Sequence, residues 1–216
     1  MTFVKNVTLC TIAWGSDYVK KTIEAFCKFN NFISFEKILF FTDQTNVDLP
    51  GNALNIYLPK YFFDKSMSSM KIVGPLHSLA MNPYCHFVLK DLYKYLETSH
   101  VLLFQYDGWI KNPKAWDERW LSYDYIGAPW LLPNNSWIVG NGGFSLRSQK
   151  LCQILGTDDS FHSGTPEDWL ICVTIRAALE KRYGIRFAPV DMAKKFSVEY
   201  HFPYDGQFGF HGKWHI

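Results

Sequence analysis

The segment His100–Ile110, HVLLFQYDGWI, constrains the fold of this chain more than any other stretch. Its apolar run is stopped by the polar and glycine cluster Gln105–Gly108, and a run this short fits a buried strand of a parallel sheet better than a helix. Asp107 then lies at the carboxyl end of the strand. In open α/β sheets that end faces the ligand crevice, so Asp107 is a candidate for a metal or phosphate site. The alternative is an Asp-Gly β-turn that only closes the strand.

The N-terminal part of the chain has the pattern of a βαβ unit. Val7–Trp14 is rich in β-branched and apolar residues and predicts a first strand, followed by a turn and a helix N-cap. Tyr18–Phe29 predicts an amphipathic helix, and Lys37–Phe41 predicts a second strand that leads to Asp43. Because parallel strands of one βαβ unit end on the same rim, we expect Ala13 and Asp43 to lie near each other.

The rest of the chain predicts short helices and strands joined by loops. We expect helices at Pro83–Leu96 and Ser148–Leu155 and from Trp169 to Lys181, a helical tryptophan-rich segment at Asn112–Ser122, strands at Asn55–Leu58, Tyr125–Ala128, Ile185–Pro189 and Phe196–His201, and a loop at Trp130–Ser136. The aromatic and glycine-rich tail is expected to dock on the domain. Together these elements predict a single α/β domain over residues 1–216, with a central, mostly parallel mixed sheet flanked by helices.

Two later segments are candidate site segments. Trp137–Arg147, WIVGNGGFSLR, has three glycines and Asn141 inside a strand-like pattern. Glycine in a strand marks a bulge or a close approach, either by a substrate or by packing alone. The sequence Thr165-Pro166-Glu167-Asp168 predicts a helix start with Thr165 as N-cap and two acids in the first turn. These acids either cap the helix or form a functional carboxylate pair.

Composition narrows the class of protein. Hydrophobic residues make up 48% and charged residues 19% of the 216 residues, which is ample for a core and argues against disorder. A net charge of only +2 leaves no basic stripe for a nucleic-acid partner. The aromatic content of 18% suits a sugar-binding cleft, although a Phe-rich core also explains it.

The cysteines and the apolar runs indicate the cellular compartment of the protein. Cys10, Cys27, Cys85, Cys152 and Cys172 have no CxxC pair and no metal-ligand spacing, so we expect buried free thiols in a reducing compartment. The N-terminus lacks the pattern of a signal peptide, and no apolar stretch approaches the roughly 18 residues of a membrane helix. We therefore expect a soluble, cytoplasmic protein without a membrane span, which can also be one part of a longer multidomain protein.

Four features occur together: the βαβ unit, QYDGW at a strand end, GNGGFSLRS followed by PEDW, and a late His211-Gly212-Lys213. The combination resembles glycosyltransferases of the GT-A fold over nearly the entire chain. It closely resembles the N-terminal glycosyltransferase domain of chlorovirus proteins that glycosylate the major capsid protein. The resemblance implies a GT-A-like fold and a metal-dependent enzyme that moves a hexose from a nucleotide sugar, such as UDP-glucose, to a glycan or glycoprotein acceptor with inversion. If the protein is viral, the resemblance implies that it is located in the cytoplasm of the host cell.

The resemblance also implies roles for particular residues. The family's strand-end motif, usually Asp-x-Asp, reads Gln105-Tyr106-Asp107 here, so Asp107 would hold Mn²⁺ or Mg²⁺ on the diphosphate of the donor. His211 would complete the shell of the cation, which favours Mn²⁺, and Lys213 would meet the diphosphate. Asp168 would be the general base of an inverting displacement. The expected nucleotide contacts are Thr11, Ala13, Tyr18, Asp43, Lys71, Gln105 and Tyr106, and the expected sugar or acceptor contacts are Trp130, Trp137, Asn141, Gly142, Gly143 and Glu167.

Two other functions remain open from the sequence. A catalytically inactive module that binds a nucleotide sugar or a glycan is one, because Gln105 stands where the first acid of the motif is expected. A glycoside hydrolase with Asp107 and Asp168 as its two carboxylates is the other. Hydrolysis, however, has no use for a βαβ nucleotide half or for a late His-Gly-Lys.

Overall fold

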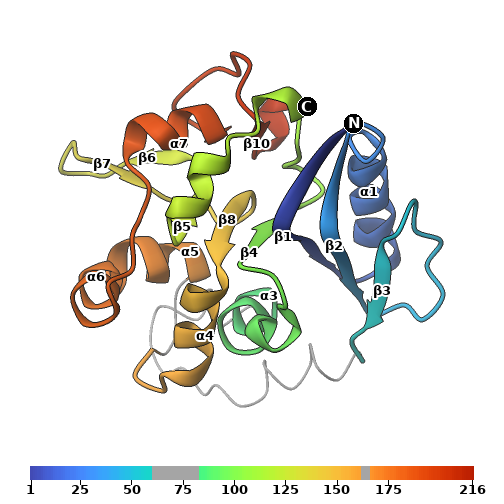
Figure 1. Cartoon of the computed structure of the whole chain (residues 1–216), viewed down its shortest axis with the longest axis horizontal. Coiled ribbons are helices and arrows are strands. Elements are labelled where there is room, and N and C mark those ends of the chain that lie inside the picture. Colours follow the sequence, from blue (N-terminus) through green and yellow to red (C-terminus); the bar gives the residue numbers. More distant parts are fainter. Residues whose placement is uncertain (60–82, 162–165) are drawn as a thin grey trace.

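A six-stranded mixed sheet forms the centre of the protein (Figure 1). The computed structural model describes residues 1–59, 83–161 and 166–216. In spatial order the strands are β3 (Leu54–Tyr57), β2 (Ile33–Thr42), β1 (Thr2–Ala13), β4 (His100–Leu103), β8 (Ser145–Ser148) and β5 (Tyr125–Ile126). The pairs β2–β3, β1–β2 and β1–β4 are parallel, whereas β8 runs antiparallel to both β4 and β5. The predicted mostly parallel mixed sheet is therefore confirmed.

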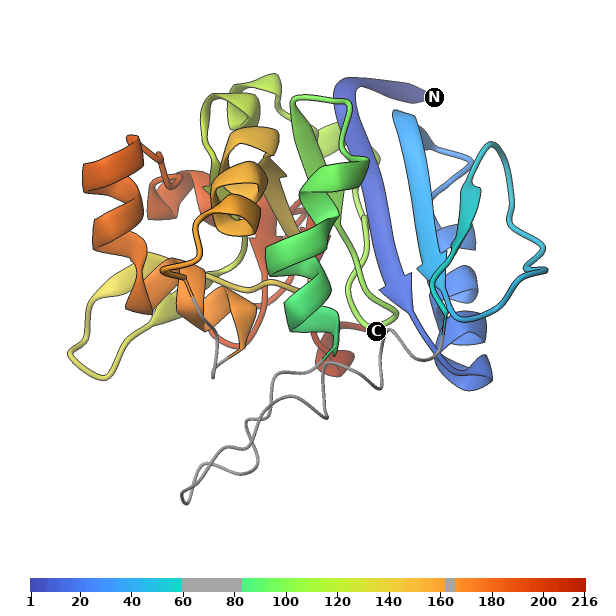
Figure 2. The ribbon, with the colours of Figure 1, turned by 90° about the horizontal axis from the view of Figure 1, so that it is seen from below.

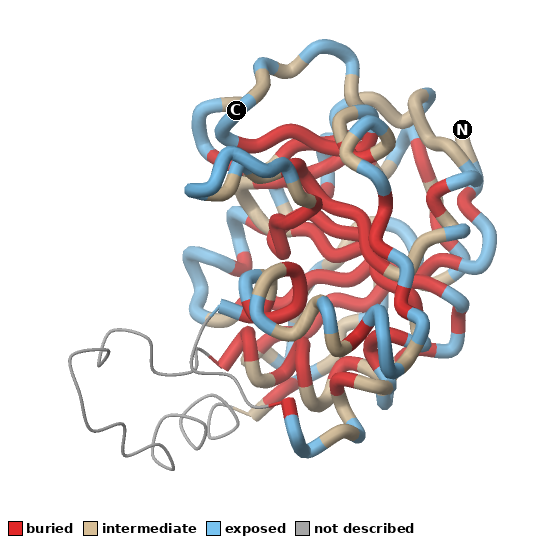
Figure 3. Tube along the Cα trace, turned by 90° about the vertical axis from the view of Figure 1, so that its left-hand side faces the viewer, coloured by how far each residue is buried: buried red, intermediate tan, exposed pale blue. Residues whose placement is uncertain are grey.

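Helices cover both faces of this sheet (Figure 2). On one face, Leu9 of β1 joins a core cluster with Phe26 of α1 (Ser16–Cys27). On the other face, Ile12 of β1 joins a second cluster with Phe87, which belongs to the helical segment after α3 (Pro83–His86). This alternation follows from the period of two residues along a strand. The central strands β4 and β8 and most of β1 and β2 lie in the buried interior of one compact domain, whereas the edge strand β3 is partly exposed (Figure 3).

The N-terminal βαβ unit agrees with its prediction. β1 and β2 pair in parallel with Ala13 opposite Thr42, so the carboxyl ends of both strands lie on one rim. The N-cap of α1 is Gly15, which makes no side-chain cap hydrogen bond, so the expected side-chain cap is wrong. The carboxylate of Asp43 instead accepts a hydrogen bond of 3.0 Å from the backbone N–H of Gly15, which ties the end of β2 to the N-cap residue.

The helical segment that starts at Pro83 is confirmed but changes its winding. α3 continues as a π-helical turn at Phe87–Asp91 and a 3₁₀ turn at Leu92–Tyr95. Its neighbour α4 (Gln149–Thr157) starts at Ser148, whose hydroxyl accepts from the backbone N–H of Leu151. The expected helix after residue 148 is thereby confirmed.

Three other predictions of secondary structure are wrong in part. Trp130 lies in a strand rather than a loop, because β6 (Pro129–Leu131) pairs with β7 (Trp137–Val139) in a hairpin. The expected strand at Ile185–Pro189 is reduced to one bridge between Phe187 and Tyr125. The tryptophan-rich segment forms only two 3₁₀ turns, at Pro113–Ala115 and Glu118–Ser122.

The C-terminal part contains a helix that the sequence pattern did not indicate. α7 (Val190–Phe196) precedes the short strand β9 (Ser197–Val198), where a strand from Phe196 was expected. β9 pairs in parallel with β10 (Gly209–Phe210). Phe208 and Phe210 are fully buried, so the prediction of a docked tail is confirmed.

The segment after Pro166 is helical but broken. α5 (Glu167–Trp169) continues as a π-helical turn at Leu170–Thr174 and then as α6 (Arg176–Tyr183), which ends at Gly184 in the left-handed conformation. The N-cap position of α5 is Pro166, and Thr165 lies outside the described residues.

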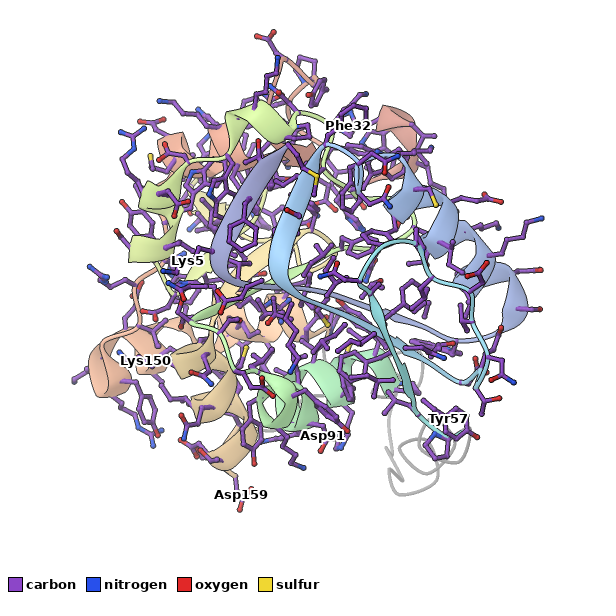
Figure 4. All side chains as sticks on the ribbon, turned by 45° about the vertical axis from the view of Figure 1, so that its right-hand side comes forward. Lys5, Phe32, Tyr57, Asp91, Lys150 and Asp159 are labelled. Atoms are coloured by element: carbon purple, nitrogen blue, oxygen red, sulfur yellow. The ribbon has the colours of Figure 1, made fainter. Side chains whose placement is uncertain are left out.

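The remaining features of the fold are its charged surface and its free cysteines. Charged side chains such as Lys5, Lys150 and Asp159 extend from the surface (Figure 4). All five cysteines are free and four of them are buried, but Cys27 is exposed, so the expectation of burial is wrong there. Within the described ranges, no helix combines the length and the apolar character needed to cross a membrane.

Candidate functional site

A cavity of about 390 Å³ lies at the carboxyl ends of β1 and β4. It is lined by Ile12, Ala13, Trp14, Tyr18, Thr22, Tyr84, Gln105 and Tyr106. Four of the expected nucleotide contacts, Ala13, Tyr18, Gln105 and Tyr106, thus lie around one space. The rings of Tyr18 and Tyr106 meet edge to face at a centroid distance of 5.4 Å. Trp14 and Tyr84, which the sequence reasoning did not single out, also line the cavity.

The other expected nucleotide contacts lie differently. Thr11 is buried, and its hydroxyl donates to the carbonyl of Phe104 at 2.9 Å, which ties β1 to the residue after β4. Asp43 holds the start of α1 through Gly15. Neither Thr11 nor Asp43 lines the cavity, and Lys71 lies outside the described residues.

The residues Gln105–Gly108 form a tight turn at this rim. The backbone N–H groups of Gln105 and Gly108 each donate to the carbonyl of the other at 3.1 Å, so Tyr106 and Asp107 occupy the two central positions. The carbonyl of Asp107 accepts from the backbone N–H of Gly212 at 2.7 Å. Gln105–Gly108 therefore forms a turn, and this turn does more than close the strand, because it also joins the strand end to the C-terminal loop.

A polar cluster forms where that loop meets the turn. The Nε2 atom of His211 lies 3.2 Å from Oε1 of Gln105 and 3.5 Å from Oδ1 of Asp107. Its Nδ1 atom lies 3.1 Å from Oε1 of Glu199 and 3.0 Å from Nδ2 of Asn141. The cluster gathers residues from four distant parts of the sequence. Of these, Glu199 was not anticipated.

Electrostatics couples the members of this cluster. Burial disfavours the charged imidazolium, but the carboxylates of Asp107 and Glu199 outweigh it and raise the pKa of His211 to about 9. Burial likewise opposes ionisation of both acids, yet His211 holds the pKa of Asp107 and the pKa of Glu199 below their ordinary values. Near neutral pH two ionised carboxylates therefore surround a His211 ring that carries a proton on both nitrogens, with Nδ1 facing Glu199 and Nε2 facing Asp107 and Gln105.

The same cluster offers ligands to a cation. Oδ1 of Asp107 is buried and has no hydrogen-bond partner among the described residues. It lies 3.5 Å from His211 Nε2, close to the roughly 3 Å that separates adjacent ligands at metal distances of about 2.1 Å. Within the described ranges, no group of three or more His, Cys, Asp or Glu side chains is arranged to hold a metal. The residues present thus fit a partial shell of one carboxylate, one imidazole and the amide oxygen of Gln105.

The glycine-rich segment packs against these groups. A Cβ atom on Gly143 would lie 2.2 Å from Nε2 of His211, and one on Gly142 would lie 2.0 Å from Oε1 of Glu167. Asn141 adopts a positive φ of 62° and accepts a hydrogen bond from the backbone N–H of Phe144. The close approach that the glycines indicated is therefore made, at least in part, by protein side chains.

Asp168 lies beside this segment. Its Oδ2 accepts from the backbone N–H of Gly142 at 2.8 Å, and its Oδ1 accepts from the N–H of Trp169 at 2.8 Å. Burial, together with the neighbouring charge of Glu167, raises its pKa to about 6. Asp168 therefore has the pKa of a group that can exchange a proton near neutrality.

Glu167, the neighbour of Asp168, is buried. Its Oε1 accepts from Arg147 at 3.1 Å, and both side chains are almost completely buried. Its Oε2 accepts a weak hydrogen bond from the thiol of Cys85 at 3.4 Å. The carboxylate of Glu167 is thus used by an internal ion pair.

The two expected tryptophan platforms have different surroundings. The indole N–H of Trp130 donates to Oε2 of Glu199 at 2.7 Å, and its ring lies 6.2 Å from that of Trp169. Trp137 instead contacts the rings of His201 and Phe202. Only Trp130 contacts the polar cluster directly.

Lysines lie near the tyrosine side of the cavity. Lys213 is exposed, with Nζ 5.7 Å from the centre of the Tyr106 ring, and Lys21 lies 5.9 Å from the same ring. Lys21 was missed because it belongs to the polar face of an amphipathic helix, where lysine is expected in any case. Glu199 was missed because it follows a short strand in an aromatic segment and matches no motif.

Comparison with known proteins gives one family. Residues 79–211 match DUF5672, which is described as a protein of unknown function, and they cover more than half of the chain. The chain belongs to this family. The matched region includes Asp107, Asn141, Asp168, Glu199 and His211, and it ends before Lys213. No curated protein matches the chain.

Proposed function

We propose that this protein is a metal-dependent glycosyltransferase with a GT-A-like fold. It would transfer a hexose from a UDP-sugar to a glycan or glycoprotein acceptor in the cytoplasm, with inversion at the anomeric carbon. The observation that carries the proposal is the buried oxygen of Asp107 without a hydrogen-bond partner among the described residues, placed beside His211 and next to a cavity lined by Tyr18 and Tyr106. The resemblance to chlorovirus glycosyltransferase domains points to a capsid-protein glycan as one acceptor to test.

The cavity supports the donor half of the proposal. A volume of about 390 Å³ falls in the size range of small-molecule sites, and the aromatic side chains offer faces and edges to a nucleobase. Lys21 and Lys213 lie on the same side, where their charges would favour a diphosphate. The position at the carboxyl ends of parallel strands is where open α/β sheets bind ligands.

Asp107, His211 and Gln105 would hold the cation. A bound Mn²⁺ or Mg²⁺ supplies Lewis-acid neutralisation of the charge that develops on the diphosphate leaving group. The imidazole ligand favours Mn²⁺ over Mg²⁺. The turn that carries Asp107 and the loop that carries His211 are tied through Gly212, so both ligands are positioned before a ligand binds.

Asp168 would accept the proton of the acceptor hydroxyl. Each of its oxygens accepts one backbone hydrogen bond and has a further lone pair for the substrate. A pKa of about 6 suits a general base that works near neutral pH, because the group is ionised yet still basic.

A thermal-shift screen tests the donor and the cation together. Nucleoside diphosphates and nucleotide sugars would be added with and without Mn²⁺, because a ligand that binds only the folded state raises the melting temperature. We expect the largest rise with a uridine nucleotide plus Mn²⁺. No rise with any nucleotide would contradict the proposal.

Replacement of Asp107 by Asn tests the cation ligand. The change removes the negative charge and turns one oxygen into an amide, so Mn²⁺-dependent binding of UDP should weaken at least tenfold while the fold is retained. Titration calorimetry with and without Mn²⁺ measures the loss, and Asp191→Asn, which changes an exposed acid of α7, serves as the matched control. Unchanged Mn²⁺-dependent affinity in Asp107→Asn would remove Asp107 from the site.

The pH dependence of activity tests Asp168. Its pKa is raised to about 6, so the base is protonated and inactive below that pH and ionised above it. We expect kcat/KM to rise about tenfold for each pH unit below 6 and to level off above it. Initial rates between pH 4.5 and 8 at saturating Mn²⁺ measure the profile, and a rate independent of pH between 5 and 7 would contradict the assignment.

A nucleotide-sugar or glycan-binding module without catalysis is the second candidate. It is favoured by Gln105, an amide at the place where the resemblance leads one to expect an acid. Such a module would bind a nucleotide in the thermal-shift screen but release no nucleoside diphosphate with any acceptor.

A further inference from the structure

Glu199 is a buried acid for which the proposed mechanism has no use. It is 6% exposed, and it lies directly after β9, whose pairing with β10 brings it beside His211. The backbone N–H of His211 donates to the carbonyl of Val198 at 2.9 Å, so the two side chains are fixed next to each other by the backbone.

The carboxylate of Glu199 is contacted by three side chains, those of Trp130, His211 and Asn141. Oε2 accepts from the indole N–H of Trp130 at 2.7 Å, and Oε1 lies 3.1 Å from Nδ1 of His211. An ionised carboxylate can only accept hydrogen bonds, so its contact with the ring requires a proton on Nδ1.

The side-chain amide of Asn141 also faces Nδ1 of His211, but as a hydrogen-bond donor and not as an acceptor. Its Oδ1 accepts from the backbone N–H of Phe144 at 3.0 Å, which turns the amide so that Nδ2 faces Nδ1 of His211 at 3.0 Å. An amide NH₂ can only donate, so Asn141 alone would favour an unprotonated Nδ1 and a proton on Nε2. The charged acceptor wins this competition, because the amide of Asn141 also has the carboxylate of Glu199 as a partner, and hydrogen bonds to ionised groups are about twice as strong as neutral ones.

We propose that Glu199 is a positioning residue that holds a proton on Nδ1 of His211, so that a divalent cation that binds beside Oδ1 of Asp107 displaces the proton of Nε2 and takes up its lone pair. The inference rests on the proposed function, since it concerns the cation site of that same enzyme. A ligating histidine that donates its other ring N–H to a carboxylate is oriented and made more basic by it. Trp130 would belong to this arrangement through its hydrogen bond to Glu199.

Substitution of Glu199 by Gln gives a specific test. Because the indole N–H of Trp130 can only donate, the amide oxygen of the new side chain stays with Trp130 and its NH₂ group turns toward Nδ1 of His211. Both neighbours of Nδ1 are then donors, so a ring that keeps a single proton carries it on Nε2, and the cation ligand is lost. We expect the Mn²⁺ affinity to fall about 10–100-fold, measured as free Mn²⁺ by electron paramagnetic resonance in the presence of UDP.

A second substitution separates positioning from a general structural effect. In the Glu199→Gln/Asn141→Asp double variant, the new carboxylate accepts from Phe144 with one oxygen and from Nδ1 with the other, so a carboxylate again holds the proton on Nδ1. Aspartate tolerates the positive φ at this position. We expect the double variant to regain most of the lost affinity, with circular dichroism confirming that both variants are folded.

The outcomes distinguish the inference from the proposed function. Tight Mn²⁺ binding by Glu199→Gln would overturn the inference while leaving the cation site itself in place. Equal weakening in the single and double variants would also overturn it, because the loss would then not depend on an acceptor at Nδ1. If the unchanged protein binds no Mn²⁺ with or without UDP, both the inference and the metal-dependent function fail.

Discussion

Replacement of Asp168 by Asn is expected to lower the turnover number by about 10² or more, while the protein still binds UDP in the presence of Mn²⁺. The amide cannot accept the proton of the acceptor hydroxyl, and a lost general base typically costs about 10²–10⁴ in rate. The rise of kcat/KM through pH 6 should disappear in the same variant, since the group that titrates there is gone. Release of UDP in single-turnover experiments measures the effect.

If Asp168 has only a structural role at the helix start, the expected changes in stability and turnover are different. Both oxygens of Asp168 accept from backbone N–H groups, so the Asn variant turns an NH₂ group toward one of these donors. This costs about 1–3 kcal/mol of stability and loses the favourable interaction of an acid with the start of α5. If Asp168 only caps the helix, the melting temperature falls but the turnover of the folded enzyme hardly changes. Asp191→Asn, which removes an acid from the first turn of α7, is the matched control for the helix-start effect.

The stereochemistry of the product tests the same residue independently. A base that activates the acceptor for direct attack gives a product with inverted anomeric configuration, which NMR can read during the first turnovers. A retained configuration would exclude Asp168 as the base of a single displacement. The search would then move to groups on the same face of the sugar as the leaving diphosphate.

The sheet was predictable from the sequence because local signals and the final fold agree there. The apolar run before Gln105 and the amphipathic pattern of α1 are strong, periodic and bounded by polar or glycine residues. The hairpin of β6 and β7 and the helix α7 were missed for a physical reason. Their segments are short, with at most seven residues each, so local signals are weak and tertiary packing decides their conformation. In α7, burial of Ala193 and Phe196 outweighs weak local preferences.

The candidate site was predictable only where a motif carries it. Asp107, Asp168 and His211 each follow a recognisable turn, helix start or loop signal, and the structure places Asp107 and His211 3.5 Å apart. The contacts that tune them come from residues far apart in sequence, such as Glu199 and Asn141 around one imidazole. No local pattern encodes such a meeting, because it depends on the pairing of β9 with β10 and on the left-handed conformation at Asn141.

The largest loss of stability is expected from Arg147→Met. The guanidinium of Arg147 is completely buried, bonds Glu167 at 3.1 Å and lies over the ring of Tyr125 with 5.3 Å between Cζ and the ring centre. Removal of the cation leaves the carboxylate of Glu167 buried without its partner, which costs about 3–5 kcal/mol. With a slope of about 2 kcal/mol per molar urea, the unfolding midpoint should fall by about 1.5–2.5 M.

The Arg147→Met/Glu167→Gln double variant should recover part of this stability, because no charge then remains buried. If the double variant is no more stable than Arg147→Met, the loss is caused by packing and not by the unpaired buried charge of Glu167.

The ion pair of Arg147 and Glu167 also influences the proposed general base Asp168, because Glu167 raises the pKa of Asp168 and Arg147 lowers it. In Arg147→Met the pKa of Asp168 should therefore rise, which moves the acid limb of the rate profile to higher pH. In the double variant it should fall below that of the unchanged protein, because Glu167 has the larger influence of the two. Rate profiles of the two variants that shift in opposite directions would tie the buried ion pair to the proton acceptor beside it.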